Sequence, residues 1–143
     1  MAAYNKFRSA VEYMAEGVFN FGSDTLKFMM TNGSNAPVNT NTIKGNLTEI
    51  SAGNGYSAGG STTAQQSSAQ TAGVYKLVVT DTVFTASGGS MSAFRYVVLY
   101  DDTPSSPADP LVAWWDYGSE ITLASGETFT VDADDSNGIF TVT

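Results

Sequence analysis

The chain of 143 residues contains neither cysteine nor histidine. Without cysteine it can form no disulfide framework and no thiolate metal site, so its stability must come from packing or from association with partners. Without histidine it lacks the side chain best suited to proton transfer near neutral pH and the commonest imidazole ligand for metals. The two absences together exclude most catalytic triads and most zinc sites.

Basic residues are scarce, because 6 Lys and Arg stand against 14 Asp and Glu, for a net charge of -8. Nucleic acids and anionic membranes both favour cationic faces, so neither is an expected partner. The imbalance is concentrated in residues 96–143, which hold nine acids and no base. The two ends of the chain should therefore present different surfaces.

Long hydrophobic runs are missing as well. Nowhere do 18 apolar residues follow one another, and the N-terminal MAAYNKFRSA has no continuous apolar stretch. We therefore expect no membrane span and no secretion signal, and synthesis as a soluble protein in the cytoplasm. The length suits one domain, which we place at residues 1–143.

The N-terminal third carries two periodic patterns. From Phe7 to Val18 the apolar residues recur at helical spacing, and residues 1–22 are therefore expected to form an N-terminal helix or arm. Leu26, Phe28 and Met30 then alternate with polar residues, as in a strand, before a turn at Asn32-Gly33.

Residues 51–73 are uncharged and rich in Gly, Ser, Thr and Ala, a composition typical of a linker or mobile loop. Long structureless loops are uncommon inside small domains. Residues 62–69 are therefore also compatible with a polar edge strand, or with an arm that lies on a neighbouring subunit.

Beyond Gly73, short apolar runs alternate with turn residues. The expected strands are residues 74–80, 83–86, 92–100, 111–117, 120–123, 128–132 and 138–142. Parallel sheets need helical crossovers that this sequence lacks. The sequence therefore predicts an all-β fold, an antiparallel β-sandwich with a short N-terminal helix or arm.

Two sets of acids could carry chemistry. Asp101, Asp102, Asp116, Glu120 and Glu127 could supply the two carboxyl groups of a glycosidase, with Asp116 and Glu120 as the residues to test. Acids at strand ends usually just solvate turns, which favours a structural interpretation.

Asp132, Asp134 and Asp135 form a weak calcium candidate, because the glycine comes one position late and no Glu follows at the twelfth place. A hairpin turn around Asn137-Gly138, joining residues 128–132 with 139–142, fits this segment better.

Several residues of the predicted strands are candidates for contacts. Trp114 and Trp115 must point to opposite faces of one strand, and Tyr117 shares the face of Trp115. An exposed Trp-Tyr pair can stack on a sugar or anchor a protein interface. Arg95 stands among apolar residues and is expected to pair with an acid such as Asp116.

Three segments, with the strands between them, resemble a family of small virion proteins of tailed phages. They are SDTLKFMMTN at 23–32 followed by a Pro-containing turn, GNGYSAGG at 53–60, and FRYVVLYDDT at 94–103 running on through DPLVAWWDYGSEITLASGETFTVDADDSNGIFTV at 109–142. The last block is the most specific of the three.

The resemblance implies a capsid decoration (cement) protein, a β-sandwich of possible jelly-roll form that binds the outside of the head in many copies. Its partners would be the major capsid protein and further copies of itself, as a dimer or trimer. It implies no enzyme activity and no cofactor. Its location would be the capsid surface of the virion, after synthesis in the cytoplasm of the bacterial host.

On this interpretation the contact candidates are Tyr4, Lys6, Phe7 and Arg8, which gather cationic and aromatic groups at the N-terminus, together with Trp115 and Tyr117. A helix packed on its own sandwich is an equally good interpretation of the N-terminal segment. The alternatives for the whole chain are a tail, fibre or head-completion component, a carbohydrate-binding adhesin module, and a carboxylate-based hydrolase.

Overall fold

The computed structural model describes residues 2–143. In this part of the chain there are ten strands, one α-helix and two short 3-10 helices, joined by loops. The elements are β1 (Ala3–Lys6), α1 (Ser9–Ala15), β2 (Leu26–Thr31), η1 (Gly33–Asn35), η2 (Lys44–Asn46), β3 (Ser61–Thr63), β4 (Gln65–Thr71), β5 (Val74–Val79), β6 (Thr82–Thr85), β7 (Phe94–Asp101), β8 (Leu111–Ile121), β9 (Thr128–Val131) and β10 (Phe140–Val142). Every strand pair is antiparallel. The predicted all-β, antiparallel class is confirmed.

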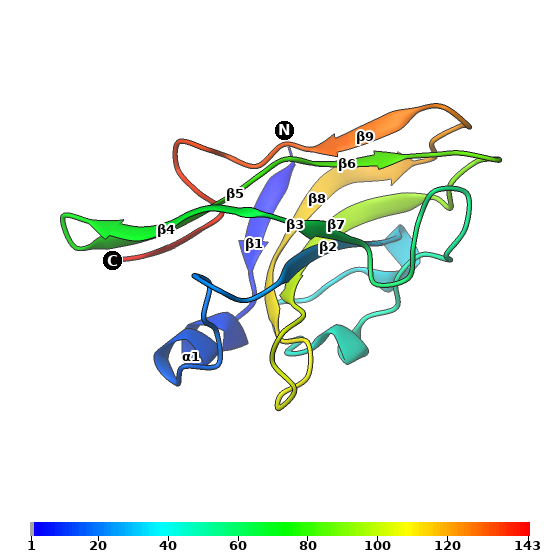
Figure 1. Cartoon of the computed structure of the whole chain (residues 1–143). Helices are drawn as coiled ribbons and strands as arrows, with labels where there is room; N and C mark the ends of the chain where they lie inside the picture. The colour runs from blue at the N-terminus through cyan, green and yellow to red at the C-terminus, as the bar shows by residue number, and fades with distance from the viewer. Residues whose placement is uncertain (1) are drawn as a thin grey trace.

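The strands form two layers (Figure 1). The first layer is a five-stranded sheet in the order β1-β8-β7-β2-β3. The second contains the three-stranded sheet β10-β5-β4 and the pair β6-β9. This division into five strands and three plus two differs from the eight-stranded double sheet of a jelly roll.

β9 and β10 are not the two arms of a hairpin, so the hairpin predicted around Asn137-Gly138 is wrong. β9 pairs with β6 and β10 pairs with β5, which places β9 and β10 end to end along the ribbon formed by β5 and β6. Residues 132–139 bulge out between them. Gly138 lies there at φ +77°, and a Cβ at this position would come 2.7 Å from the carbonyl oxygen of Leu77.

The chain changes layers at Ala64. β3 pairs with β2 in the first layer, whereas β4 pairs with β5 in the second. The carbonyl of Ala64 accepts a hydrogen bond from the Thr80 amide (2.8 Å), and a register shift follows between Gln65 and Ser67. The polar edge strand expected within residues 62–69 is therefore present, and it belongs to both layers.

Apolar side chains fill two regions, one on each face of the first layer. The main core lies between the layers and includes Phe28, Leu77, Phe94 and Phe140. The outer face is also buried, and its members are Phe7, Met29, Tyr96, Val98, Tyr100, Leu111 and Trp114, with Leu47 packed against them. β7 is consequently buried on both faces.

The N-terminal helix is confirmed in a shorter form, because α1 spans Ser9–Ala15 and Gly17 follows it at φ +73°. Residues 3–6, however, form β1, in which Tyr4 lies opposite Trp115. The periodicity of the sequence begins only at Phe7, and β1 depends on a strand more than a hundred residues away. The N-terminus is thus an edge strand of the sheet and not a free arm. In residues 2–143 no helix has the length and apolar character needed to cross a membrane.

One long strand replaces the two predicted at residues 111–117 and 120–123. β8 continues to Ile121, which pairs with Phe94. Between Asp116 and Ile121 the partner strand advances by only two residues, so β8 bulges there. Gly118 makes this possible at φ +97°, and its amide donates to Oδ1 of Asp116 (2.8 Å). The glycine marks a bulge and not a strand end.

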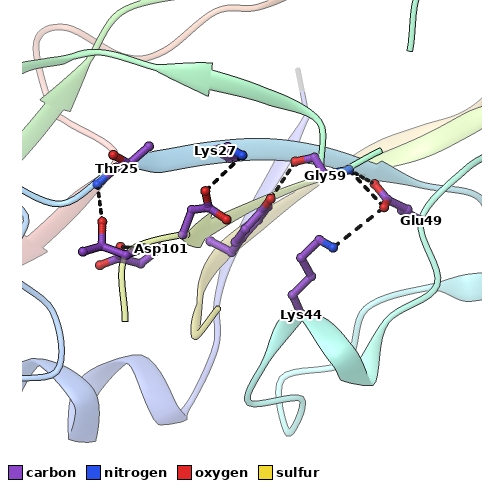
Figure 2. A network of polar contacts seen from close by, with 9 residues as sticks. Thr25, Lys27, Lys44, Glu49, Gly59 and Asp101 are labelled. Carbon is purple, nitrogen blue, oxygen red and sulfur yellow. Dashed lines mark hydrogen bonds and ion pairs between the residues drawn. The ribbon is translucent and has the colours of Figure 1, made fainter. Parts of the chain in front are cut away.

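A polar network orders the glycine-rich segment before β3, residues 53–60 (Figure 2). The carboxylate of Glu49 accepts from the Gly59 amide (2.9 and 3.0 Å) and from the Tyr56 hydroxyl (2.8 Å). Nζ of Lys44 lies 3.8 Å from Oε1 of Glu49, and the hydroxyl of Tyr100 donates to the Gly59 carbonyl (2.7 Å). These contacts attach the segment to β7.

Candidate binding groove

A groove of about 810 Å³ lies between the layers. β1, β2, β7 and β8 of the first layer contribute residues to one wall, and β9 with the turn at 132–139 contributes the other. Its lining residues are Ala2, Tyr4, Phe28, Val97, Trp115, Tyr117, Phe129, Thr130, Val131, Asp132, Ala133, Asp134, Asp135, Gly138 and Ile139. The groove therefore combines aromatic rings with three carboxyl groups.

The aromatic rings of the groove are held in place by strand register. Tyr4 lies opposite Trp115 across the β1-β8 pair, and their ring centroids are 5.4 Å apart in an edge-to-face arrangement. The Tyr117 ring lies 5.9 Å from that of Phe129 across the groove. Tyr4 is 47% exposed and Tyr117 is 52% exposed. Partial burial raises the pKa of Tyr4, which keeps its hydroxyl neutral.

The three acids lie on the opposite wall. The carboxylate of Asp134 is occupied by its own turn, because it accepts from the Ser136 and Asn137 amides (2.9 and 2.8 Å) and from Nδ2 of Asn137 (2.8 Å). These donors, with those of Asn137 first, lower the pKa of Asp134. Within residues 2–143 no three acids are placed to hold a metal ion, so the calcium candidate at Asp132, Asp134 and Asp135 gains no support.

Three of the six predicted contact residues line the groove, and three do not. Tyr4, Trp115 and Tyr117 meet in the groove. Lys6 is on β1 but outside the groove lining, and its Nζ lies 5.6 Å from the centre of the Phe140 ring.

Phe7 and Arg8 do not belong to the groove. Phe7 is fully buried, with its ring 4.5 Å from that of Trp114, so it cannot contact a partner. Arg8 is exposed, and its amide donates to the Asn39 carbonyl (3.0 Å). Predicting Phe7 as a contact residue was wrong, because the sequence could not show that the outer face of the sheet is covered.

The expected separation of an N-terminal contact surface from an acidic C-terminal surface is also wrong. Asp132, Asp134 and Asp135 line the same groove as Ala2 and Tyr4. The pairing of β1 with β8 brings the first residues of the chain beside the acidic turn. Any partner that enters the groove therefore meets rings and negative charge together.

The acids proposed for a hydrolase have structural contacts. Asp116 forms an ion pair with Arg95, with Nε and Oδ1 2.8 Å apart, which confirms that predicted pair and lowers the pKa of Asp116. Glu120 accepts a hydrogen bond from the Gly33 amide (2.6 Å). Asp101 is buried, and desolvation, with a smaller contribution from Asp24, raises its pKa to about 7.

No protein-family model matches the chain, and no curated protein and no solved structure is significantly similar to it. Inferences about function accordingly rest on the groove, on the surface of the molecule and on the sequence resemblance.

Proposed function

We propose that this chain is a structural, non-catalytic protein that binds the outer surface of a tailed-phage capsid and stabilises it. The observation that supports the proposal best is the convergence of Tyr4, Trp115 and Tyr117 in one groove. They come from two strands that are far apart in the sequence, and two of them are about half exposed. Tyr and Trp are enriched at the centres of protein interfaces, where rings anchor a partner at low entropic cost.

The proposed occupant of the groove is an extended segment of the major capsid protein that carries both apolar and basic side chains. Its apolar side chains would contact Trp115 and Phe129. Its basic side chains would face Asp132 and Asp135, both of which are exposed to solvent on the acidic wall. Charge complementarity therefore favours a basic segment over an acidic one.

Stabilisation by this route needs only modest affinity at each site. A ligand that binds the assembled shell and not the free subunits favours the assembled form by mass action. Many copies bound to one shell act together if each bridges neighbouring subunits. A groove that takes one short segment is sufficient for that purpose.

The first test compares copy numbers on purified capsids that lack the protein and are then incubated with it. Trp115→Ala and Tyr117→Ala should each lower the number of bound copies, measured by quantitative mass spectrometry relative to the major capsid protein. Val83→Ala is the matched control, because Val83 is exposed on β6 and lies outside the groove. Wild-type protein that does not bind capsids at all would refute the proposal.

The charge argument has its own test. The double variant Asp132→Lys and Asp135→Lys should weaken capsid binding, whereas Glu12→Lys on the exposed face of α1 should not. Equal binding by all three proteins would exclude the acidic wall from the interface. It would leave the aromatic wall as the contact.

Carbohydrate binding is the second candidate for the same groove. Exposed rings beside carboxyl groups also suit a sugar, which can stack on Tyr117 and hydrogen-bond to Asp135. Titration of the wild-type protein with polysaccharides, followed by tryptophan fluorescence, separates the two. A saturable change that is lost in Tyr117→Ala would favour the carbohydrate, and unchanged fluorescence would count against it.

A further inference from the structure

β4 is an unpaired edge of the second layer. Within residues 2–143 its only strand partner is β5, on one side. Residues 66–74 are exposed on both faces of the hairpin, and Figure 1 shows this hairpin extending at the left of the molecule. An ordered hairpin with such exposed residues is unusual in a small domain, because little burial offsets the loss of conformational freedom.

The turn of the hairpin fixes which backbone groups are free. Ala72 and Gly73, at φ +51° and +81°, form a two-residue turn that leaves Thr71 opposite Val74. In such a hairpin the pair flanking the turn is hydrogen-bonded, and hydrogen-bonded pairs then alternate with non-bonded pairs. Gln70 and Ser68, opposite Tyr75 and Leu77, are the non-bonded ones. Their N–H and C=O groups point outward from β4.

Nothing in β4 guards this edge. Natural edge strands avoid pairing by being short, by carrying charge or proline, or by lying under another segment. β1 and β10 are short, with four and three residues, but β4 has seven residues without a charge or a proline. An unguarded strand of this kind is a template for another strand.

Charge restricts the partner. The chain carries a net charge of -8, yet no charged residue occurs from Ile50 to Tyr75. Lys76 is the one charged residue of β5, and its Nζ donates to the Ser136 carbonyl (2.8 Å). Two copies of this acidic protein would repel each other over much of their surface, but not at β4.

We propose that β4 pairs with β4 of a second copy, antiparallel across a two-fold axis, so that the two second layers join into one continuous sheet. Identical antiparallel strands satisfy a two-fold axis by construction, and Ser68 and Gln70 of each copy supply donors and acceptors to the other. No residue of β4 lines the groove. The inference therefore goes beyond capsid binding, and either proposal can fail while the other stands.

Proline at Ser68 tests the pairing, because it removes an outward N–H without removing a bond to β5. Wild-type protein should sediment as a dimer, and Ser68→Pro should weaken dimerisation by about tenfold or more. Ser68→Ala is the matched control, since it loses only the side-chain contact with the Tyr75 hydroxyl (2.9 Å) and should stay dimeric. Sedimentation velocity over a range of concentrations gives the comparison.

A second variant covers the case in which Ser68→Pro does not fold. Ser67→Lys keeps every backbone group but adds a positive charge to both strands of the proposed pair, so it should also weaken dimerisation. Thr128→Lys on β9 adds the same charge at an exposed strand position away from β4 and should not. A wild-type monomer at all concentrations, a trimer, or a dimer unchanged in Ser67→Lys would each overturn the proposal.

Hydrogen exchange of the wild-type protein locates the interface directly. The Ser68 and Gln70 amides should exchange quickly at low concentration and become protected as the dimer forms. A dimer in which these two amides stay unprotected would place the interface elsewhere and overturn the proposal.

Discussion

Arg95 on β7 and Asp116 on β8 form a two-pronged ion pair, with Nε 2.8 Å from Oδ1 and Nη2 3.1 Å from Oδ2. The pair lies beside the bulge of β8, where the Gly118 amide donates to the same Oδ1. One carboxylate thus joins the two central strands and fixes the bulge from which Tyr117 projects.

Asp116→Asn should lower stability near neutral pH by a modest, salt-dependent amount, because the pair is partly exposed. The pKa of Asp116 lies below its ordinary value of 3.8, so its contribution is present above that value and is lost as the pH falls through the lowered pKa. The difference between wild type and variant should therefore shrink below pH 4. Urea unfolding from pH 3 to pH 7 checks this, with Glu16→Gln as an exposed control.

Asp101 should act in the opposite sense. Its raised pKa means that the folded protein binds more protons than the unfolded chain between about pH 4 and pH 7, so stability from this group falls as the pH rises through that window. Asp101→Asn should remove this loss and make the protein more stable than wild type at pH 8, by a few kcal/mol at most.

The carbonyl oxygen of the introduced amide can keep the bond that Oδ1 of Asp101 now accepts from the Thr103 amide (3.1 Å). Thermal unfolding at pH 5 and pH 8 gives the measurement. Asp102→Asn is the control, because Asp102 is exposed and pairs with Lys27 at 3.0 Å. A variant with the same pH dependence as wild type would mean that Asp101 is ionised throughout.

Gly60→Ala should cost about 3 kcal/mol or more, since it combines φ +79° with a Cβ that would overlap the Phe28 carbonyl oxygen. Gly88→Ala separates the two effects. Gly88 lies at φ +76° with nothing near its missing Cβ, so only the backbone strain of about 1 to 2 kcal/mol should remain. Chemical denaturation of both variants tests whether the glycine-rich segment packs as closely as described.

Phe7→Ala should destabilise the fold by about 3 to 5 kcal/mol, because the ring is fully buried against Trp114. Val11→Ala, at a position 55% exposed on α1, should change stability little. Equal stability of the two variants would mean that Phe7 does not pack into the core and that the N-terminal segment is a loosely attached arm. Equilibrium unfolding distinguishes these outcomes.

Local patterns in the sequence predicted the local structure. The alternation of Leu26, Phe28 and Met30 predicted β2, the helical spacing after Phe7 predicted α1, and the isolation of Arg95 among apolar residues predicted its pair with Asp116. In each case a short stretch, or one charge that needed a partner, carried the information.

Long-range pairing could not be predicted in the same way. β1 has no strong strand pattern of its own and forms because it can pair with the edge of β8. The contact between Tyr4 and Trp115 could therefore not be predicted from the sequence. The covering of the outer face, which buries Phe7, likewise depends on residues distant in the chain. The groove is made of such long-range contacts. Its aromatic residues could be named from the sequence, but their arrangement in one groove could not be predicted.

β3 and β4 are a single stretch of chain interrupted only at Ala64. Tension applied to β4 by anything bound along its edge would pass through Ala64 into β3 and from there along β2, while the Thr80 amide holds the corner from the other layer. Both layers would thus share a force applied at this edge. The force would act along the strands and would not separate one layer from the other strand by strand. If the proposed attachment to a capsid is right, the corner at Ala64 would couple the two layers mechanically when the shell is under internal pressure.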